Sequence, residues 1–291
     1  QLSVKYPTRC DRKSKGFGQQ ISFQGSTIVP NDISISFLSD EDNKNKLNEF
    51  IVKRFLDTAA TAWNKKFCVT NDLENVHTDE GIKHIYTPDM ISVLEEADNR
   101  IVCHIQDILQ KGLTKISVKT VDSDVVVILL GFMKQFKNVR NDIALSVDFG
   151  SGVNRKTISI NKIFDELGDD LCCSLPFFHS FSGADSTTSK MSKKYWFSNW
   201  MNFPMKDILT ATFTELGCCP LMEDVIRAQP IIQSFVSYVY SKGKVHNIDD
   251  LRFNMFQKSS TNELRILPPS KDALLQHSLR CSYLAAIIFL F

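Results

Sequence analysis

Residues 95–130 constrain the fold of this chain more strongly than any other stretch of its sequence. Residues 115–120 are β-branched and strand-like, and a cation and a glycine, Lys111 and Gly112, mark the end of the helix predicted before them. A helix followed by a strand within about 25 residues is half of a βαβ unit, so we expect an α/β fold with a mostly parallel sheet. The helix is predicted because apolar side chains recur at three- and four-residue spacing, at Ala97, Ile101, Ile105 and Ile108.

Acidic side chains stand at both ends of this unit. Glu95, Glu96 and Asp98 open the helix, and Asp122 and Asp124 follow the strand. In open α/β sheets, ligands bind outside the carboxyl ends of the strands. Carboxylates gathered in one cleft repel each other unless a cation neutralises them, and oxygen ligands suit Mg²⁺ or Mn²⁺. Acidic residues also favour helix starts as caps and because of the helix dipole, and the spacing alone does not decide between the two interpretations.

Composition excludes several classes of protein. The 291 residues are 43% hydrophobic and 23% charged with a formal net charge of +1, which is ordinary for a soluble protein and gives no global field toward nucleic acid or membrane. Eight cysteines without a Cys-x-x-Cys motif indicate reduced thiols in an intracellular protein. The chain begins at Gln1 without a signal-like apolar run, so we expect an internal fragment. The apolar residues 284–291 are too few to span a bilayer, so no membrane partner is expected.

The rest of the amino-terminal half alternates predicted elements with loops. Residues 1–30 are basic and contain glycine, which indicates a mobile segment. A long amphipathic helix is predicted after the capping residues 39–43. Two strands, residues 67–70 and 82–86, are predicted on either side of a polar loop.

Beyond residue 124 the sequence predicts a buried helix, a hairpin and then a helical region. Residues 143–147 and 157–160 are expected to be strands joined by a turn, because the sequence DFGSGVN between them lacks the ending of a phosphate loop. A short helix ending at Gly168 is followed by an apolar segment, residues 171–182, that Pro176 interrupts. From residue 190 onward, helical patterns are separated by prolines and glycines.

Three motifs in a fixed order carry a resemblance to a known family. EEADNR, then DSDVVVIL, then LPFFHSFSGADSTTS resemble the EEADTR-like, DTDVLVL-like and LHAFTGCDT-like motifs of a family of uncharacterised invertebrate and fish proteins that occur as mobile-element-like copies. The segments LRFNMFQK and LPPSKDALLQHSLRCSY are similar to that family's helical tail, so the resemblance covers most of the chain from about residue 30. The chain departs from these motifs at Asn99, where threonine is usual, and at Ala184, where cysteine is usual.

That family in turn resembles the PIN-like (Rossmann-like) fold of the flap-endonuclease superfamily, in which carboxylates hold two divalent metal ions. The resemblance implies a nuclease that hydrolyses the phosphodiesters of DNA or RNA with two Mg²⁺ or Mn²⁺ ions. Glu95 would lie next to the ligands and support them. The residues that match the metal ligands and catalytic positions are Glu96, Asp98, Asp122, Asp124 and Asp185.

The resemblance also implies how the chain is divided. Residues 31–189 would form the PIN-like α/β domain, and residues 190–291 an all-helical carboxyl-terminal region. Lys190, Lys193 and Lys194 would contact the nucleic-acid backbone, in the nucleus or the cytoplasm. Flap-type nucleases carry a further acidic residue on a first strand, which has no evident counterpart in this chain, so we expect the domain to be amino-terminally truncated. The fragment itself can therefore be inactive even where full-length relatives cut.

Two other functions fit the same residues. The strand followed by Asp-Ser-Asp matches haloacid-dehalogenase-like phosphohydrolases, with Asp122 as nucleophile and Asp124 as acid/base. A trapped aspartyl-phosphate on Asp122 would favour that class. The chain can also be a catalytically dead mobile-element remnant or a nucleic-acid-binding module that has lost its metals. His104 and His179 are interpreted as helix side chains with satisfied hydrogen bonds.

Overall fold

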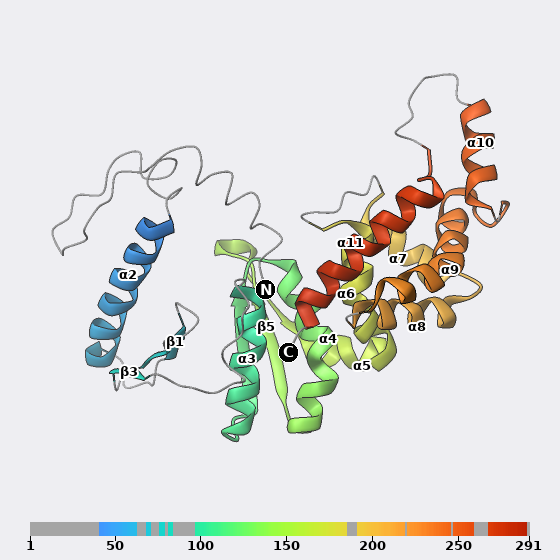
Figure 1. Ribbon diagram of the computed structural model, residues 1–291. Helices are drawn as coiled ribbons and strands as arrows, with labels where there is room; N and C mark the ends of the chain where they lie inside the picture. The colour runs from blue at the N-terminus through green and yellow to red at the C-terminus, as the bar shows by residue number, and fades with distance from the viewer. Residues whose placement is uncertain are drawn as a thin grey trace. The chain divides into compact units, whose positions relative to one another are not determined.

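The structure is a computed structural model, and its chain divides into two compact units, Gln1–Cys103 and His104–Phe291 (Figure 1). Residues on both sides of position 190 belong to the second unit. The described residues are 41–62, 68–70, 76–78, 81–83, 97–184, 191–218, 220–245, 247–258 and 267–289.

The first unit contains a long helix and a small antiparallel sheet. Helix α2 (Glu41–Ala62) confirms the predicted amphipathic helix. Strands β1 (Cys68–Thr70), β2 (Val76–Thr78) and β3 (Gly81–Lys83) pair in that order, each antiparallel to the next. The prediction of an uninterrupted polar loop between two strands was wrong, since β2 lies within it. Main-chain pairing to β1 and β3 stabilises this short strand, whose side chains carry little hydrophobic pattern.

The second unit is organised on a small mixed sheet. Strand β4 (Lys115–Thr120), helix α4 (Ser123–Val139) and strand β5 (Ala144–Phe149) form a crossover, and β4 pairs parallel to β5 with Val118 opposite Val147. A 3-10 turn, η2 (Gly152–Asn154), leads to β6 (Lys156–Ser159), which pairs antiparallel to β5. The predicted parallel pair and hairpin are therefore both present, in an α/β arrangement whose described sheet has the order β4-β5-β6.

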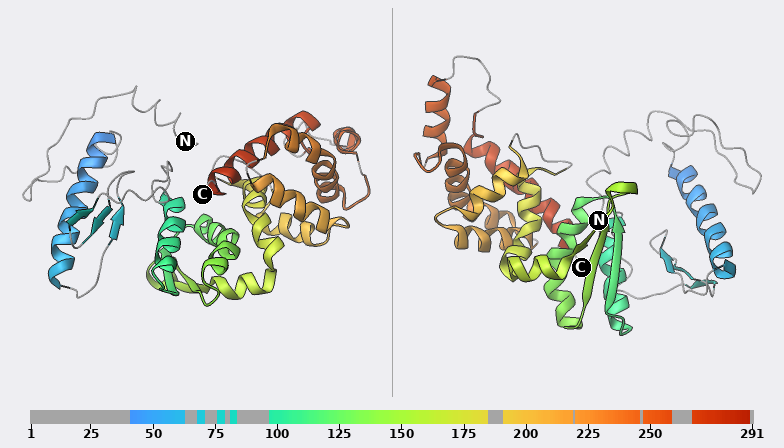
Figure 2. Two further views of the ribbon diagram at one scale, coloured as in Figure 1. Left: turned by 60° about the horizontal axis from the view of Figure 1, so that its bottom comes forward. Right: turned by 180° about the vertical axis from the view of Figure 1, so that it is seen from behind.

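Helices flank this sheet. Helix α3 (Ala97–Gln110) ends at Lys111 and Gly112 as predicted, and Gly112 takes the left-handed φ of +83°. Residues 104–110 of α3 and helix α4 lie on opposite faces of the sheet (Figures 1 and 2). The buried side chains of α4 include Ile128, Leu129 and Phe132, which explains why its sequence is apolar almost throughout.

A buried helix connects the sheet region to the helical region. Helix α5 (Ile160–Leu167) ends at Gly168, and α6 (Asp169–Gly183) follows at once. The predicted interruption at Pro176 was wrong, because α6 continues through it. Proline removes one helical hydrogen bond, but α6 packs against α4, α8 and α11, and this tertiary packing outweighs the local cost.

The remaining described helices confirm the predicted helical region. They share one hydrophobic core with α6, in which Phe213 lies against Phe177, Phe178, Phe181 and Trp200 at ring-centroid distances of 5.1–6.2 Å. The helices are α7 (Lys193–Met201), α8 (Lys206–Gly217), α9 (Met222–Ser241), α10 (Ile248–Lys258) and α11 (Lys271–Phe289).

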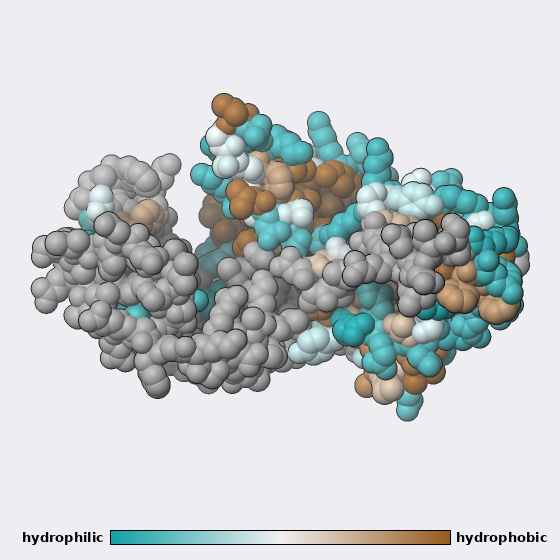
Figure 3. Space-filling view, turned by 90° about the horizontal axis from the view of Figure 1, so that it is seen from above, coloured by the Kyte–Doolittle hydropathy of each residue, from teal (hydrophilic) through white to brown (hydrophobic). Residues whose placement is uncertain are grey.

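The surface carries both hydrophobic and hydrophilic residues. In the face shown in Figure 3, hydrophobic residues gather in patches between hydrophilic ones. Among the described residues, no helix combines the length and the apolar character that crossing a bilayer requires.

The aromatic core yields a prediction on stability. Phe213→Ala should lower the free energy of unfolding by about 3–5 kcal/mol, because it deletes a fully buried ring and leaves a cavity. Phe253→Ala is the matched control: this ring on α10 is 59% exposed, so its removal should change stability by no more than about 0.5 kcal/mol. Urea unfolding of both variants measures the difference, and equal losses would contradict the described core.

Candidate functional site

The candidate site begins where β4 ends. Asp122 is the N-cap of α4, and its Oδ1 accepts a hydrogen bond from the backbone N–H of Asp124 at 2.9 Å. The N–H of Asp122 in turn donates to the side-chain oxygen of Thr120 at 3.0 Å. The Asp-Ser-Asp sequence thus starts a helix, as a capping interpretation predicts. The same turn places two carboxylates at the carboxyl end of a parallel strand, where α/β proteins bind ligands.

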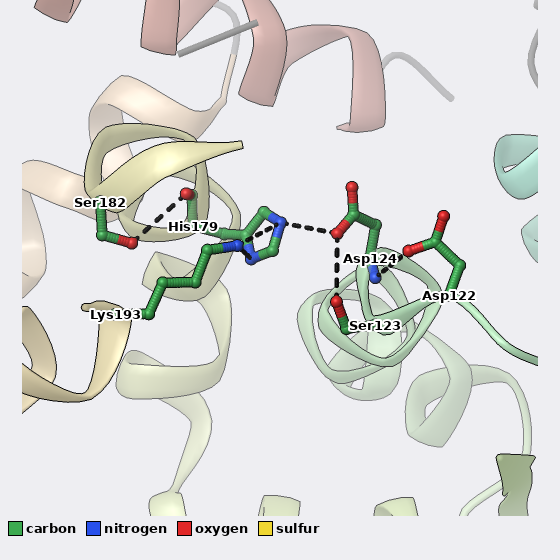
Figure 4. A network of polar contacts seen from close by, with 6 residues as sticks. All are labelled: Asp122, Ser123, Asp124, His179, Ser182 and Lys193. Carbon is green, nitrogen blue, oxygen red and sulfur yellow. Dashed lines mark hydrogen bonds and ion pairs between the residues drawn. The ribbon is translucent and has the colours of Figure 1, made fainter. Parts of the chain in front are cut away.

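A histidine from α6 contacts the second of these carboxylates. The Nε2 atom of His179 lies 2.8 Å from Oδ1 of Asp124, although the two residues are far apart in sequence (Figure 4). The side chain of His179 is 8% exposed and that of Asp124 is 35% exposed. A polar ring buried to this extent requires a hydrogen-bond partner. Asp124 supplies it, so Nε2 is the nitrogen that donates.

A lysine from the start of α7 lies against the same ring. The Nζ atom of Lys193 is 2.9 Å from Nδ1 and 3.1 Å from Nε2 of His179 (Figure 4). The two in-plane lone-pair directions of an imidazole diverge, so an ammonium group equally close to both nitrogens lies over the ring. The N-cap Ser192 fixes the start of α7 by accepting from the N–H of Tyr195 at 3.2 Å. Three helix ends therefore meet at one polar cluster.

These neighbours lower the pKa of Asp124. The hydrogen bond from His179 is the largest cause; partial burial opposes it by disfavouring the charged form, and the charges of His179 and Lys193 then lower the pKa further. Asp124 is consequently an ionised carboxylate at neutral pH. Its negative charge is already compensated in part by groups of the chain itself.

The predicted site residues are only partly covered by the structure. Glu95, Glu96, Asp185 and Lys190 lie outside the described residues. Asp98 is the second residue of α3, but its side chain is likewise outside the description. The structure does bring Asp122, Asp124 and Lys193 together, and Lys194 is exposed on α7.

Among the residues that the structure describes, no group of three or more histidine, cysteine or acidic side chains is placed to hold a metal ion. The second oxygen, Oδ2, of Asp122 and of Asp124 accepts no hydrogen bond from a described residue. In Figure 4 these two oxygens point away from the contacts that hold the first ones. Carboxylate oxygens are the ligands that Mg²⁺ and Mn²⁺ prefer.

The interpretation of His179 as a helix side chain with satisfied hydrogen bonds is confirmed, because His179 lies in α6 and contacts Asp124. The sequence did not identify Asp124 as the partner, and so missed that His179 ties α6 to the acidic pair. One signal was present: His179 is the one titratable side chain other than cysteine in the apolar residues 171–182. A titratable group inside a buried helix needs a polar partner from elsewhere in the fold.

The pKa of Asp124 gives a direct test of this contact. In the wild-type chain, Asp124 should titrate below the ordinary aspartate value of about 3.9. His179→Phe keeps a ring but removes the hydrogen bond and the charge, while burial still disfavours the carboxylate, so the pKa of Asp124 should rise. NMR titration of the side-chain carboxyl carbon measures the change.

The same pair links stability to pH. Because the pKa of Asp124 is lower in the folded than in the unfolded chain, ionised Asp124 stabilises the fold above about pH 4, and this contribution disappears as pH falls through its folded pKa. His179→Phe should remove this dependence. The control His277→Phe alters a histidine on α11 that contacts the backbone oxygen of Phe181 instead, and should leave the titration of Asp124 unchanged. An unaltered pKa in His179→Phe would contradict the described contact.

Comparison with known proteins identified no relative of this chain. No protein-family model, no curated protein and no solved structure matches the chain. The chemistry of the site therefore has to be inferred from its own residues.

Proposed function

We propose that this chain is the core of a divalent-metal-dependent nuclease that hydrolyses phosphodiester bonds of DNA or RNA. The observation that carries the proposal is the 2.8 Å contact between His179 Nε2 and Asp124 Oδ1. It fixes the last turns of α6 beside the acidic pair that follows β4. In this proposal Asp185, which follows α6 in the sequence and lies outside the described residues, would add the third acidic segment that the family resemblance implies.

The chain's own groups suit this chemistry in three respects. Asp122 and Asp124 each have one oxygen fixed by a hydrogen bond and a second oxygen that no described residue occupies. Asp124 is ionised at neutral pH, as a metal ligand must be. Bound Mg²⁺ or Mn²⁺ would activate a water molecule and stabilise the leaving oxygen. Glu96, Asp98 and Asp185 would complete the ligand set in this proposal, with Glu95 beside them.

Basic residues near the acidic pair fit a polyanionic substrate. Lys193 reaches the site itself, where its ammonium group lies against His179. Lys194 is exposed on the same helix and is available to a phosphate backbone. In this proposal Lys193 stabilises the arrangement of His179, while Lys194 and Lys190 contact the strand.

One observation favours a second candidate, a nucleic-acid-binding module without catalytic metals. Carboxylates in a nuclease site need metal ions because their negative charge is otherwise uncompensated. Here His179 and Lys193 already compensate Asp124. A chain that had lost its metals would be expected to retain this kind of internal ion pair.

Metal binding and cleavage separate the two candidates. Mn²⁺ should broaden the NMR signals of residues 122–124 selectively, and the chain with Mn²⁺ should cut single-stranded or flapped oligonucleotides. Asp122→Asn and Asp124→Asn should each reduce both effects to background, because each removes a charged ligand.

The matched control is Asp250→Asn. Asp250 lies in the first turn of α10, as Asp124 does in α4, so the substitution tests for a general effect of an acidic helix start. It should leave metal binding and cleavage unchanged. Oligonucleotide binding without Mn²⁺ broadening or cleavage would contradict the nuclease proposal and support the binding module.

A further inference from the structure

A cavity of about 580 Å³ lies at the same edge of the sheet as the acidic pair. One wall consists of Lys119, Thr120 and Val121, at the end of β4 and directly before Asp122. The other wall is the loop between β5 and β6, which Figure 1 shows at the upper end of the sheet. The residues of this loop that line the cavity are Gly150, Ser151, Gly152 and Arg155.

Two of the lining residues of the loop are glycines with a left-handed backbone. Gly150 has φ +94° and Gly152 has φ +56°, a region that L side chains rarely adopt. The N–H of Gly150 donates to the backbone oxygen of Thr120 at 3.0 Å, which joins the two walls. The N–H groups of Ser151 and Gly152 donate to no described acceptor. Exposed amides beside glycines of positive φ form concavities that bind anions.

The charged side chains around the cavity favour an anion as well. Arg155 is held by Asp148, to which it donates through both Nε and Nη2. This pairing lowers the pKa of Asp148, and the charge of Lys119 lowers it further. Lys119 itself forms no ion pair with a described residue and is exposed. Two cations and one carboxylate leave a net positive charge beside amide and hydroxyl donors.

We propose that this cavity binds a phosphate group of a nucleotide unit, which deepens and rests on the proposed nuclease function. A single phosphate ion would fill little of the volume, which lies within the usual range for organic ligands of about 300–1,000 Å³. The cavity therefore accepts the phosphate together with its sugar. Val121 lines the cavity and Asp122 follows it in the sequence. A nucleic-acid strand with one phosphate in the cavity would therefore place its next phosphodiester group beside Asp122 and Asp124.

Salt dependence of binding tests the assignment. A fluorescein-labelled single-stranded ten-nucleotide DNA is titrated with the full chain in EDTA, so that neither metal nor cleavage contributes. Each phosphate contact on a single strand adds about 0.7 to the slope of log K against log salt. Lys119→Gln should reduce the magnitude of that slope by about 0.7. The ratio of the variant's binding constant to that of wild type should therefore be roughly fivefold smaller at 0.1 M salt than at 1 M.

Lys115→Gln is the matched control, because Lys115 is exposed on the same strand but lies at its opposite end. It should leave both affinity and slope unchanged, and Lys119→Arg should retain the wild-type slope. Equal effects of Lys119→Gln and Lys115→Gln, or no effect of either, would overturn the proposal. Lys119-dependent binding without Mn²⁺-dependent cleavage would remove the nuclease function and leave the phosphate site standing.

The source of the phosphate is decided by NMR of the amides of Ser151 and Gly152. A nucleoside monophosphate that shifts them in wild type but not in Lys119→Gln supports a site for free nucleotides. Shifts that require the oligonucleotide support a site for the strand. Equal shifts with a nucleoside that lacks phosphate, or no shift with any of these ligands, would overturn the assignment.

Discussion

The contact between His179 and Asp124 is the interaction on which the polar edge of the sheet depends. Helix α6 is buried between α4 on one side and α8 and α11 on the other, so its position is fixed by hydrophobic packing along its length. Near the carboxyl-terminal end of α6 lies the imidazole ring of His179, and Asp124 accepts a hydrogen bond from that ring. Packing thus sets where the histidine is, and the histidine sets which oxygen of Asp124 is occupied.

This arrangement determines what a cation at the site must compete with. His179 holds one oxygen of Asp124, and the charge of Lys193 beside it helps to favour the ionised form of that carboxylate. The second oxygens of Asp122 and Asp124 accept no hydrogen bond from the described residues, and in the proposed function they would bind a divalent ion while the helix cap stays intact. The cavity bounded by Lys119 and Arg155 adds positive charge at the same edge of the sheet. Negative and positive groups at one sheet edge support the proposal of a phosphodiester substrate bound with divalent metal ions.

Much of the local structure could be predicted because it depends on short-range pattern. The helix before β4, the hairpin of β5 and β6, and the helices beyond residue 190 all follow from hydrophobic period and from turn residues. The short strand β2 and the continuous helix through Pro176 could not, because main-chain pairing and tertiary packing override local preference there. The role of His179 escaped for the same reason: its partner lies on another element. The convergence of Glu96, Asp98 and Asp185 on the site stays a prediction.

A crystal of the chain soaked in Mn²⁺, with data collected at the manganese absorption edge, tests the proposed metal site most directly. The nuclease proposal predicts anomalous density within ligand distance, about 2.0–2.3 Å, of oxygens of Asp122 and Asp124, with His179 still bonded to Asp124. A map with no anomalous density at these carboxylates, and with the contact between His179 and Asp124 unchanged, would contradict it.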